Sequence, residues 1–371
     1  MTFDNTKTCF GFGCMRLKLD DNGKVDYKEF EKMIDIFMEN GFTYYDTARV
    51  YIGGQSETAI RDCLVKRYDR KSFTITDKLS DSCFNKEEEI RPLFYSQLES
   101  LGVEYLDYYL MHAMNATRYA KYRKTHAFEI AKELKDEGKI KHIGISFHDS
   151  PEVLDKILTE MGDYIEVVQI QYNYLDLENP NVQSEKCYEV AKKHNKPIIV
   201  MEPIKGGTLI DLPEEAKPIL DELQISSANL ALRFVADHSQ VFMILSGMGN
   251  VEMMKENISF MKEPKPMSEK ETEATKKITA IIKNKKMIPC TGCSYCTPGC
   301  PMSINIPELF KIRNSELVYR SGNAKSDYKK LTLESGLASS CIQCGQCERI
   351  CPQQLRIRKE LKDIAQAYEK E

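Results

Sequence analysis

The 371-residue chain lacks three features that would place it in other broad classes of protein. It has no apolar run that approaches the roughly 20 residues of a membrane-spanning helix. Its 52 Lys and Arg residues nearly balance its 56 Asp and Glu residues, so no basic surface for nucleic acid is expected. Residues 1–8 are polar and do not look like a targeting segment. These absences predict a cytoplasmic protein with neither a nucleic-acid partner nor a membrane partner.

The length and a change of composition predict two domains. A chain of this size usually exceeds one hydrophobic core. Residues 1–261 alternate short apolar runs with amphipathic stretches. Residues 262–287 begin with a Lys-Glu-Pro-Lys-Pro linker and continue as a charged helix. Residues 288–371 contain the clustered cysteines and show helical patterning without strand signals, so we expect a small, mainly helical iron–sulfur domain there.

The first domain contains eight expected strands, and amphipathic helices are expected between them. The strands are expected at 8–13, 43–47, 73–78, 106–112, 142–147, 166–172, 197–202 and 241–246. Regular alternation of strands and helices implies parallel pairing with right-handed crossovers. Eight units in about 250 residues predict a (β/α)8 barrel. A doubly wound open sheet is the alternative, but Gly11-Phe12-Gly13 is not its glycine-rich phosphate loop.

Eight of the thirteen cysteines form two copies of one motif near the C-terminus. In each copy three cysteines at x2 spacing are followed by x3-Cys-Pro, which is the ligand spacing of a two-cluster ferredoxin. The fourth cysteine of each run typically binds the other cluster. The spacing therefore predicts two [4Fe–4S] clusters, one on Cys290, Cys293, Cys296 and Cys351, and the other on Cys341, Cys344, Cys347 and Cys300.

Disulfides and zinc are the alternatives for these cysteines. Disulfides require an oxidising compartment, and the sequence shows no signal peptide. Structural zinc sites usually have paired CxxC knuckles rather than three cysteines at x2 spacing. Iron–sulfur clusters are therefore favoured, and they would make the chain a carrier of single electrons.

Four ionisable residues lie at or just after successive strand ends, where the chemistry of such barrels takes place. They are Asp46, Tyr51, Lys78 and His112. A Tyr hydroxyl can protonate a developing alkoxide, and a Lys held charged by an Asp stabilises the tyrosinate that remains. A His can orient the carbonyl or relay the proton. The combination predicts carbonyl reduction, whereas each residue alone could equally be structural.

These four residues, in this order and context, resemble the catalytic tetrad of the aldo-keto reductase family. The segments Gly54-Gln55-Ser56-Glu57, Lys139–Ser146, Val168–Asn173 and Glu256-Asn257-Ile258 also resemble that family. With the C-terminal cysteines, the whole chain resembles the ferredoxin-fused branch of the family.

The resemblance implies a nucleotide site, which this sequence matches only in part. Ser146 and Gln169 match the residues that bind the nicotinamide carboxamide, and Met201 takes the place of the stacking aromatic. The loop after the eighth strand would hold the phosphates, with Ser246, Gly247, Met248, Asn250 and Asn257. Gly247 and Met253 stand where NADP-dependent members have cations, so NAD, NADP and a flavin remain alternative cofactors.

The sequence leaves three functions open because nicotinamides deliver two electrons together and clusters pass one at a time. The first is an oxidoreductase that acts on a carbonyl or alcohol and exchanges electrons through the clusters, with ferredoxin or another one-electron carrier as partner. The second is an NAD(P)-dependent reductase whose cluster domain is structural or binds a partner. The third is a non-enzymatic electron-transfer protein. The basic runs 121–124 and 283–286 are expected to be solvated faces, with docking of an acidic ferredoxin as the alternative.

Overall fold

The computed structural model describes residues 9–319 and 321–369, so the polar N-terminal segment 1–8 lies outside the described residues. The chain forms two compact units. The first contains the chain up to Pro203 together with Ala231–Met267, and the second contains Ile204–Leu230 together with the chain from Ser268. The segment that follows the seventh strand is thus grouped with the cysteine-rich C-terminal residues.

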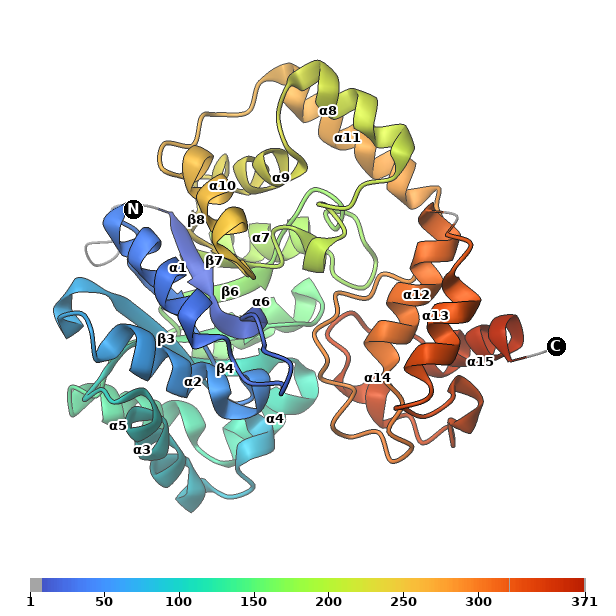
Figure 1. Cartoon of the computed structure of the whole chain (residues 1–371). Coiled ribbons are helices and arrows are strands. Elements are labelled where there is room, and N and C mark those ends of the chain that lie inside the picture. The colour runs from blue at the N-terminus through green and yellow to red at the C-terminus, as the bar shows by residue number, and fades with distance from the viewer. Residues whose placement is uncertain (1–8, 320, 370–371) are drawn as a thin grey trace. The chain divides into compact units, whose positions relative to one another are not determined.

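Eight parallel strands close into a barrel in chain order, as the alternation of strand and helix signals predicted (Figure 1). The strands are β1 (Phe10–Gly13), β2 (Tyr44–Asp46), β3 (Thr74–Leu79), β4 (Leu106–Met114), β5 (Ile140–Phe147), β6 (Val167–Gln171), β7 (Ile198–Met201) and β8 (Val241–Ser246). The pairing of β1 with β8 closes the sheet and excludes the doubly wound alternative.

Helices cover the barrel between successive strands, as the alternation of strand and helix signals predicted. They are α1 (Tyr27–Glu39), α2 (Gln55–Ile60), α3 (Ile90–Leu101), α4 (Ala116–Lys124), α5 (Ala127–Asp136), α6 (Pro151–Met161), α7 (Ser184–Lys193), α9 (Ser227–Ala236) and α10 (Val251–Met261). In α1, Asp26 caps the first turn by accepting a hydrogen bond from Glu29 N. Phe30, Ile34 and Phe37 of this helix form one buried stripe.

The interior of the barrel is filled by side chains of alternating size. Tyr44 and Tyr108 are fully buried there, and their rings lie 5.7 Å apart. Gly144 admits this packing because a Cβ atom at its position would lie 2.5 Å from Val167 O. The filled interior leaves the ends of the strands as the place where polar side chains gather.

The second unit is helical around the cysteine motifs. Its helices are α8 (Lys217–Leu223), α11 (Glu269–Lys283), α12 (Ile306–Tyr319), α13 (Ala324–Leu331), α14 (Gln346–Ile350) and α15 (Ile357–Tyr368). Leu309, Phe310, Leu361 and Ile364 belong to one buried apolar cluster, against which most of the motif cysteines pack. The sequence indicated α11 and the start of α12, whereas α8, α13, α14 and α15 were not individually predicted.

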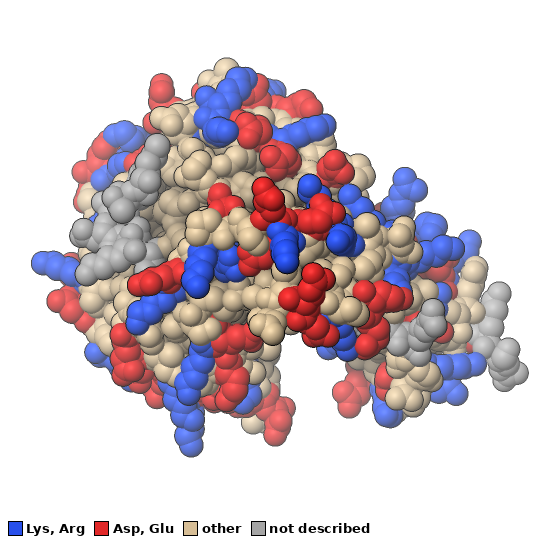
Figure 2. Space-filling model, turned by 90° about the horizontal axis from the view of Figure 1, so that it is seen from above, with Lys and Arg blue, Asp and Glu red and all other residues tan. Residues whose placement is uncertain are grey.

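Two surface features bear on possible partners. No helix in the described parts of the chain is long and apolar enough to cross a membrane. Acidic and basic side chains are interspersed over the face drawn in Figure 2, without a large region of one sign. A charged recognition surface on this face would therefore be local.

Candidate active site and iron–sulfur sites

The predicted catalytic residues come together at the carboxyl ends of β2, β3 and β4. Lys78 Nζ donates a 2.6 Å hydrogen bond to Asp46 Oδ1 and a 2.7 Å hydrogen bond to Thr47 O, and both charged side chains are buried. Tyr51 lies in the turn Tyr51–Gly54, and its ring centroid is 4.9 Å from Lys78 Nζ. The lysine ammonium is thus positioned to stabilise negative charge on the tyrosine.

His112 also lies beside Tyr51. The two ring centroids are 5.9 Å apart, with the rings edge to face. His112 Nδ1 is 2.6 Å from Ser80 Oγ, a contact that sequence reasoning did not find. Burial, with the charge of Lys78 adding to it, lowers the pKa of His112 well below its usual range. The imidazole is therefore neutral at pH 7. When Ser80 Oγ donates its proton to Nδ1, the imidazole carries its own proton on Nε2 and can donate a hydrogen bond from there.

Asp46 acts mainly as the partner of Lys78. Burial raises the pKa of Asp46, and the Lys78 charge and hydrogen bond oppose that shift. Gln169 Nε2 donates to the second oxygen, Asp46 Oδ2, at 3.2 Å. Both carboxylate oxygens are therefore engaged, which fixes the orientation of the lysine.

The residues expected to hold a nicotinamide lie on neighbouring strands. Ser146 and Gln169 are buried at the ends of β5 and β6, whereas Met201 at the end of β7 is partly exposed. Ala113 N donates to Ser146 Oγ at 3.3 Å, which leaves the serine proton available to a ligand. His148 Nδ1, just after the end of β5, is buried and has no hydrogen-bond partner among the residues that the structure describes. This donor set suits an amide or a flavin-type carbonyl.

The expected phosphate loop follows β8. Asn257 Nδ2 donates to Ser246 Oγ at 3.1 Å, and Asn250 caps α10 by accepting from Met253 N. Met248 in this loop is buried. The loop therefore presents backbone N–H groups at a helix start, which suits an anion.

A cation, Arg16, lies beside this loop. The aliphatic carbons of Arg16, which follows β1, lie 3.3–3.6 Å from where a Cβ atom of Gly247 would be. Arg16 also forms a long ion pair of 4.0 Å with Glu202. Because β1 pairs with β8, the chain ends of these strands meet, and Arg16 supplies charge that neither Gly247 nor the exposed Met253 provides.

A buried carboxyl pair lies behind the tetrad, and it too was not predicted. Glu57 in α2 and Asp77 in β3 are both fully buried, and Arg49 Nε is 3.1 Å from Glu57 Oε2. Burial, increased by the neighbouring Asp77, raises the pKa of Glu57, and burial also raises the pKa of Asp77. Two carboxyls beside one guanidinium hold a proton between them at neutral pH. Arg49 precedes Tyr51 by two residues, so this network anchors the loop that carries the tyrosine.

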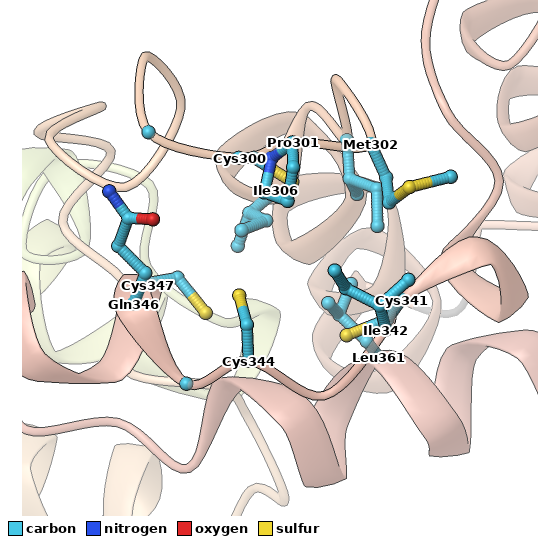
Figure 3. A pocket seen from close by; sticks show the side chains of 13 residues that line it. Cys300, Pro301, Met302, Ile306, Cys341, Ile342, Cys344, Gln346, Cys347 and Leu361 are labelled. Atoms are coloured by element: carbon cyan, nitrogen blue, oxygen red, sulfur yellow. The ribbon is translucent and has the colours of Figure 1, made fainter.

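The eight motif cysteines line two separate cavities, four cysteines in each. One is lined by Cys290, Cys293, Cys296 and Cys351, and the other by Cys300, Cys341, Cys344 and Cys347. In the second, the sulfur atoms of Cys300, Cys344 and Cys347 point toward a common space (Figure 3). The fourth cysteine of each run thus lines the cavity of the other run.

The donor set of these cavities suits iron–sulfur clusters rather than single ions. All thirteen cysteines lie in the described part of the chain and are free thiols. Among described residues, no three His, Cys, Asp or Glu side chains are close enough to hold one metal ion. Thiolates that each bind a different iron of a cluster stand farther apart than the four ligands of one zinc.

The loop after β7 contacts the first cysteine cavity within the second unit. Lys205 is buried, and its Nζ donates to Gln353 Oε1 at 3.0 Å. Gly206 has φ +60°, and a Cβ atom there would lie 2.4 Å from Thr291 O. The loop therefore fits closely against the segments that carry Cys290 and Cys351.

Comparison with known proteins agrees with this architecture. The model of the aldo/keto reductase family matches residues 10–280, and that of a 4Fe-4S dicluster domain matches residues 289–357. The chain therefore belongs to the aldo/keto reductase family. It is an oxidoreductase of that family that carries an additional 4Fe–4S dicluster domain.

Individual relatives cover the barrel portion of the chain. The NADH-specific methylglyoxal reductase of Escherichia coli is 25% identical over 283 residues, which are 64% of this chain and 84% of that protein. An aldo-keto reductase from Bacillus halodurans in its holo form has a TM-score of 0.61 at 23% identity, over 75% of this chain and 95% of that chain. One from Klebsiella pneumoniae, solved with NADP and acetate, has a TM-score of 0.60 at 19% identity, over 73% of this chain and 91% of that chain. At these identities the structural likeness establishes the fold.

Proposed function

We propose that the protein interconverts a small carbonyl compound and its alcohol at Tyr51, and that it exchanges the electrons through two [4Fe–4S] clusters. The observation that carries the proposal is the presence of both an assembled tetrad and two four-cysteine cavities in one chain. The chemistry at the barrel moves two electrons, and the clusters move them one at a time.

In the direction of reduction, the barrel residues supply and control a proton. Tyr51 donates its hydroxyl proton to the carbonyl oxygen as negative charge develops there. Lys78, held charged by Asp46, stabilises the tyrosinate that remains. His112, neutral and fixed by Ser80, orients the carbonyl oxygen by a hydrogen bond.

A bound nicotinamide or flavin would supply the hydride that completes the reduction. Ser146 and Gln169 would bind its amide or carbonyl groups, and the loop Ser246–Asn250 with Arg16 would bind its phosphate. A flavin suits the two-domain chain well because it exchanges both electron pairs and single electrons, and so connects the barrel chemistry to the clusters.

We propose that the clusters are held by the cysteine sets that line the two cavities, Cys290, Cys293, Cys296 and Cys351, and Cys341, Cys344, Cys347 and Cys300. The substrate class, a small carbonyl compound, follows from the family. The NADH-specific methylglyoxal reductase among the relatives makes methylglyoxal a suitable first substrate.

The same relative favours a second function, a nicotinamide-dependent reductase whose clusters are structural. The two functions differ in whether the clusters change oxidation state during turnover. Anaerobically purified, iron-reconstituted protein should contain about eight irons, and flavin or nicotinamide can be identified after heat release.

The deciding experiment is methylglyoxal reduction driven by a one-electron donor, reduced methyl viologen, with cluster EPR spectra recorded during turnover. Turnover in this assay that is lost in Tyr51→Phe, which keeps the ring, supports the first function. NADH-driven turnover that is unchanged by Cys344→Ser, together with no viologen-driven turnover, supports the second function and overturns the first.

A further inference from the structure

The two cysteine cavities differ in their exposure to solvent. Cys344 is exposed, whereas the other seven motif cysteines are only partly exposed. Its neighbours Ile342 and Gln343 are exposed as well. The cavity lined by Cys300, Cys341, Cys344 and Cys347 is therefore the more accessible one for a protein that exchanges electrons.

Three large, exposed apolar side chains lie on the segments that carry Cys300 and Cys341, and we call them the apolar rim. Ile342 is 60% exposed, Leu337 43% and Met302 37%. Ile342 and Met302 line the cavity itself (Figure 3), and Leu337 immediately precedes the turn Ala338–Ser340 that leads to Cys341. Exposed apolar residues gathered beside a functional group mark an interaction surface.

The charges around the two cavities also differ. From Cys341 to Arg358 the chain carries three arginines, at 349, 356 and 358, against one acidic residue, Glu348. The corresponding stretch of the first motif, Cys290–Pro307, has no charged residue. Arg358 pairs with Glu348 at 2.7 Å, which leaves Arg349 and Arg356, both exposed, as the net positive charge. We call these two residues the basic flank.

Arg349 of the basic flank is close to the exposed cysteine. Arg349 Nη1 donates a 3.2 Å hydrogen bond to Cys344 O. A Cβ atom on the intervening Gly345 would lie 3.6 Å from the guanidinium of Arg349 and 3.6 Å from that of Arg358. Arg349 and the paired Arg358 therefore lie against the loop that carries Cys344, the most exposed of the motif cysteines.

We propose that an acidic one-electron carrier protein of the ferredoxin type docks on the apolar rim and the basic flank. It would exchange single electrons with the cluster of Cys300, Cys341, Cys344 and Cys347. In each transfer the carrier loses one electron and the cluster gains it, and two transfers supply the electron pair of one carbonyl reduction. This inference rests on the proposed function, in which the clusters take part in turnover.

Charge decides between possible occupants of this surface. A second copy of this chain would bring its own arginines against the basic flank, so self-association is disfavoured. An acidic carrier gains both steering by opposite charge and burial of the apolar rim. The first cavity offers no steering by charge, because the stretch Cys290–Pro307 is uncharged.

The test uses a purified acidic ferredoxin and the full-length, cluster-loaded protein. The double variant Arg349→Glu/Arg356→Glu reverses the basic flank. Lys283→Glu/Lys286→Glu applies the same charge change to exposed residues at the end of α11, outside the proposed surface. Binding is measured by calorimetry at two salt concentrations, and electron transfer from reduced ferredoxin by stopped-flow absorbance.

We expect the flank variant to weaken binding and slow the bimolecular electron transfer at least about tenfold, with a smaller dependence on salt. The α11 variant should stay within about twofold of the parent protein. Equal effects of both variants, or an effect of the α11 variant alone, would overturn the proposal.

Arg349 contacts a ligand loop, so its variant must retain its iron content and its EPR signals. Ile342→Glu provides a second test, because it places an anion in the exposed apolar rim without removing any arginine. Failure of docking is distinct from failure of the proposed function. If viologen drives methylglyoxal reduction but ferredoxin does not bind, the proposed function is retained and the docking surface is rejected. If ferredoxin binds tightly but viologen drives no turnover, the docking surface is retained and the proposed function is rejected.

Discussion

Lys205 Nζ donates a hydrogen bond to Gln353 Oε1 across 148 residues of sequence. Lys205 follows β7 by four residues, and Gln353 follows Cys351 by two. The neighbouring Gly206 lies against Thr291, the residue after Cys290. The loop after β7 therefore supports the two segments that carry Cys290 and Cys351, which are proposed ligands of the same cluster.

The close approach of Gly206 predicts that this loop stabilises the first cluster. In Gly206→Ala the new Cβ atom would lie 2.4 Å from Thr291 O, and φ +60° is strained for alanine. We expect the variant to bind fewer than half of the roughly eight irons. Gly207→Ala is the control. Its φ is also positive, but a Cβ atom added there would have no described atom within 4 Å outside its two neighbours in the chain. Equal iron contents, measured colorimetrically after anaerobic reconstitution, would contradict this role.

The Asp46–Lys78 ion pair predicts a large stability effect of either single substitution. Lys78→Met leaves the buried Asp46 carboxylate without its partner, which should cost about 3 kcal/mol. Adding Asp46→Asn should recover most of this loss, because no charge then remains buried. The chain has no tryptophan, so urea unfolding is best followed by circular dichroism. Additive losses in the double variant would show that the two residues do not act as a pair.

The contact between Ser80 and His112 predicts a kinetic effect without loss of binding. Ser80→Ala frees the inner nitrogen and lets the imidazole change tautomer, so we expect kcat to fall about tenfold, equivalent to ~1.4 kcal/mol, at unchanged KM. Ser80→Thr should restore activity. Since the pKa of His112 is lowered well below its usual range, kcat should show no titration step near pH 6.5 in the parent enzyme.

The buried carboxyl of Glu57 predicts how stability depends on pH. Because its pKa is raised in the fold, the folded state keeps a proton that the unfolded chain releases above about pH 4.3. Stability must therefore fall as pH rises, and Glu57→Gln should flatten this decline between about pH 5 and 8. Thermal unfolding measures the effect, with Glu99→Gln on the exposed face of α3 as the control. If the stability of Glu57→Gln declined with pH as steeply as that of the parent protein, Glu57 and Asp77 would not share a proton at neutral pH.

Local patterns in the sequence predicted the barrel and placed the tetrad. Short apolar runs define strands whatever surrounds them, and Asp46, Tyr51, Lys78 and His112 are each fixed by a position relative to a strand end. The expected grouping of the cysteines into two sets depends on spacing alone. The strand that carries His112 runs further than its apolar pattern indicated, to Met114, where the register with β5 shifts.

What the sequence did not predict depends on contacts between distant segments. Arg16 reaches Gly247 because β1 closes against β8, and no local pattern records that pairing. The Glu57–Asp77 pair looks like two solvated carboxylates until the fold buries both. Lys205-Gly206-Gly207 reads as an ordinary loop after a strand, and only the fold places it beside Thr291 and Gln353.

Cys300 and Cys351 each belong by sequence to one motif and by position to the other cavity. Filling either cavity therefore orders part of the wall of its neighbour, so that loading of the second cluster follows readily once the first is in place. Molecules with one cluster would be scarce in comparison with fully loaded and empty ones. A shortage of iron in the cell would then reduce the number of working enzyme molecules and leave the competence of each unchanged.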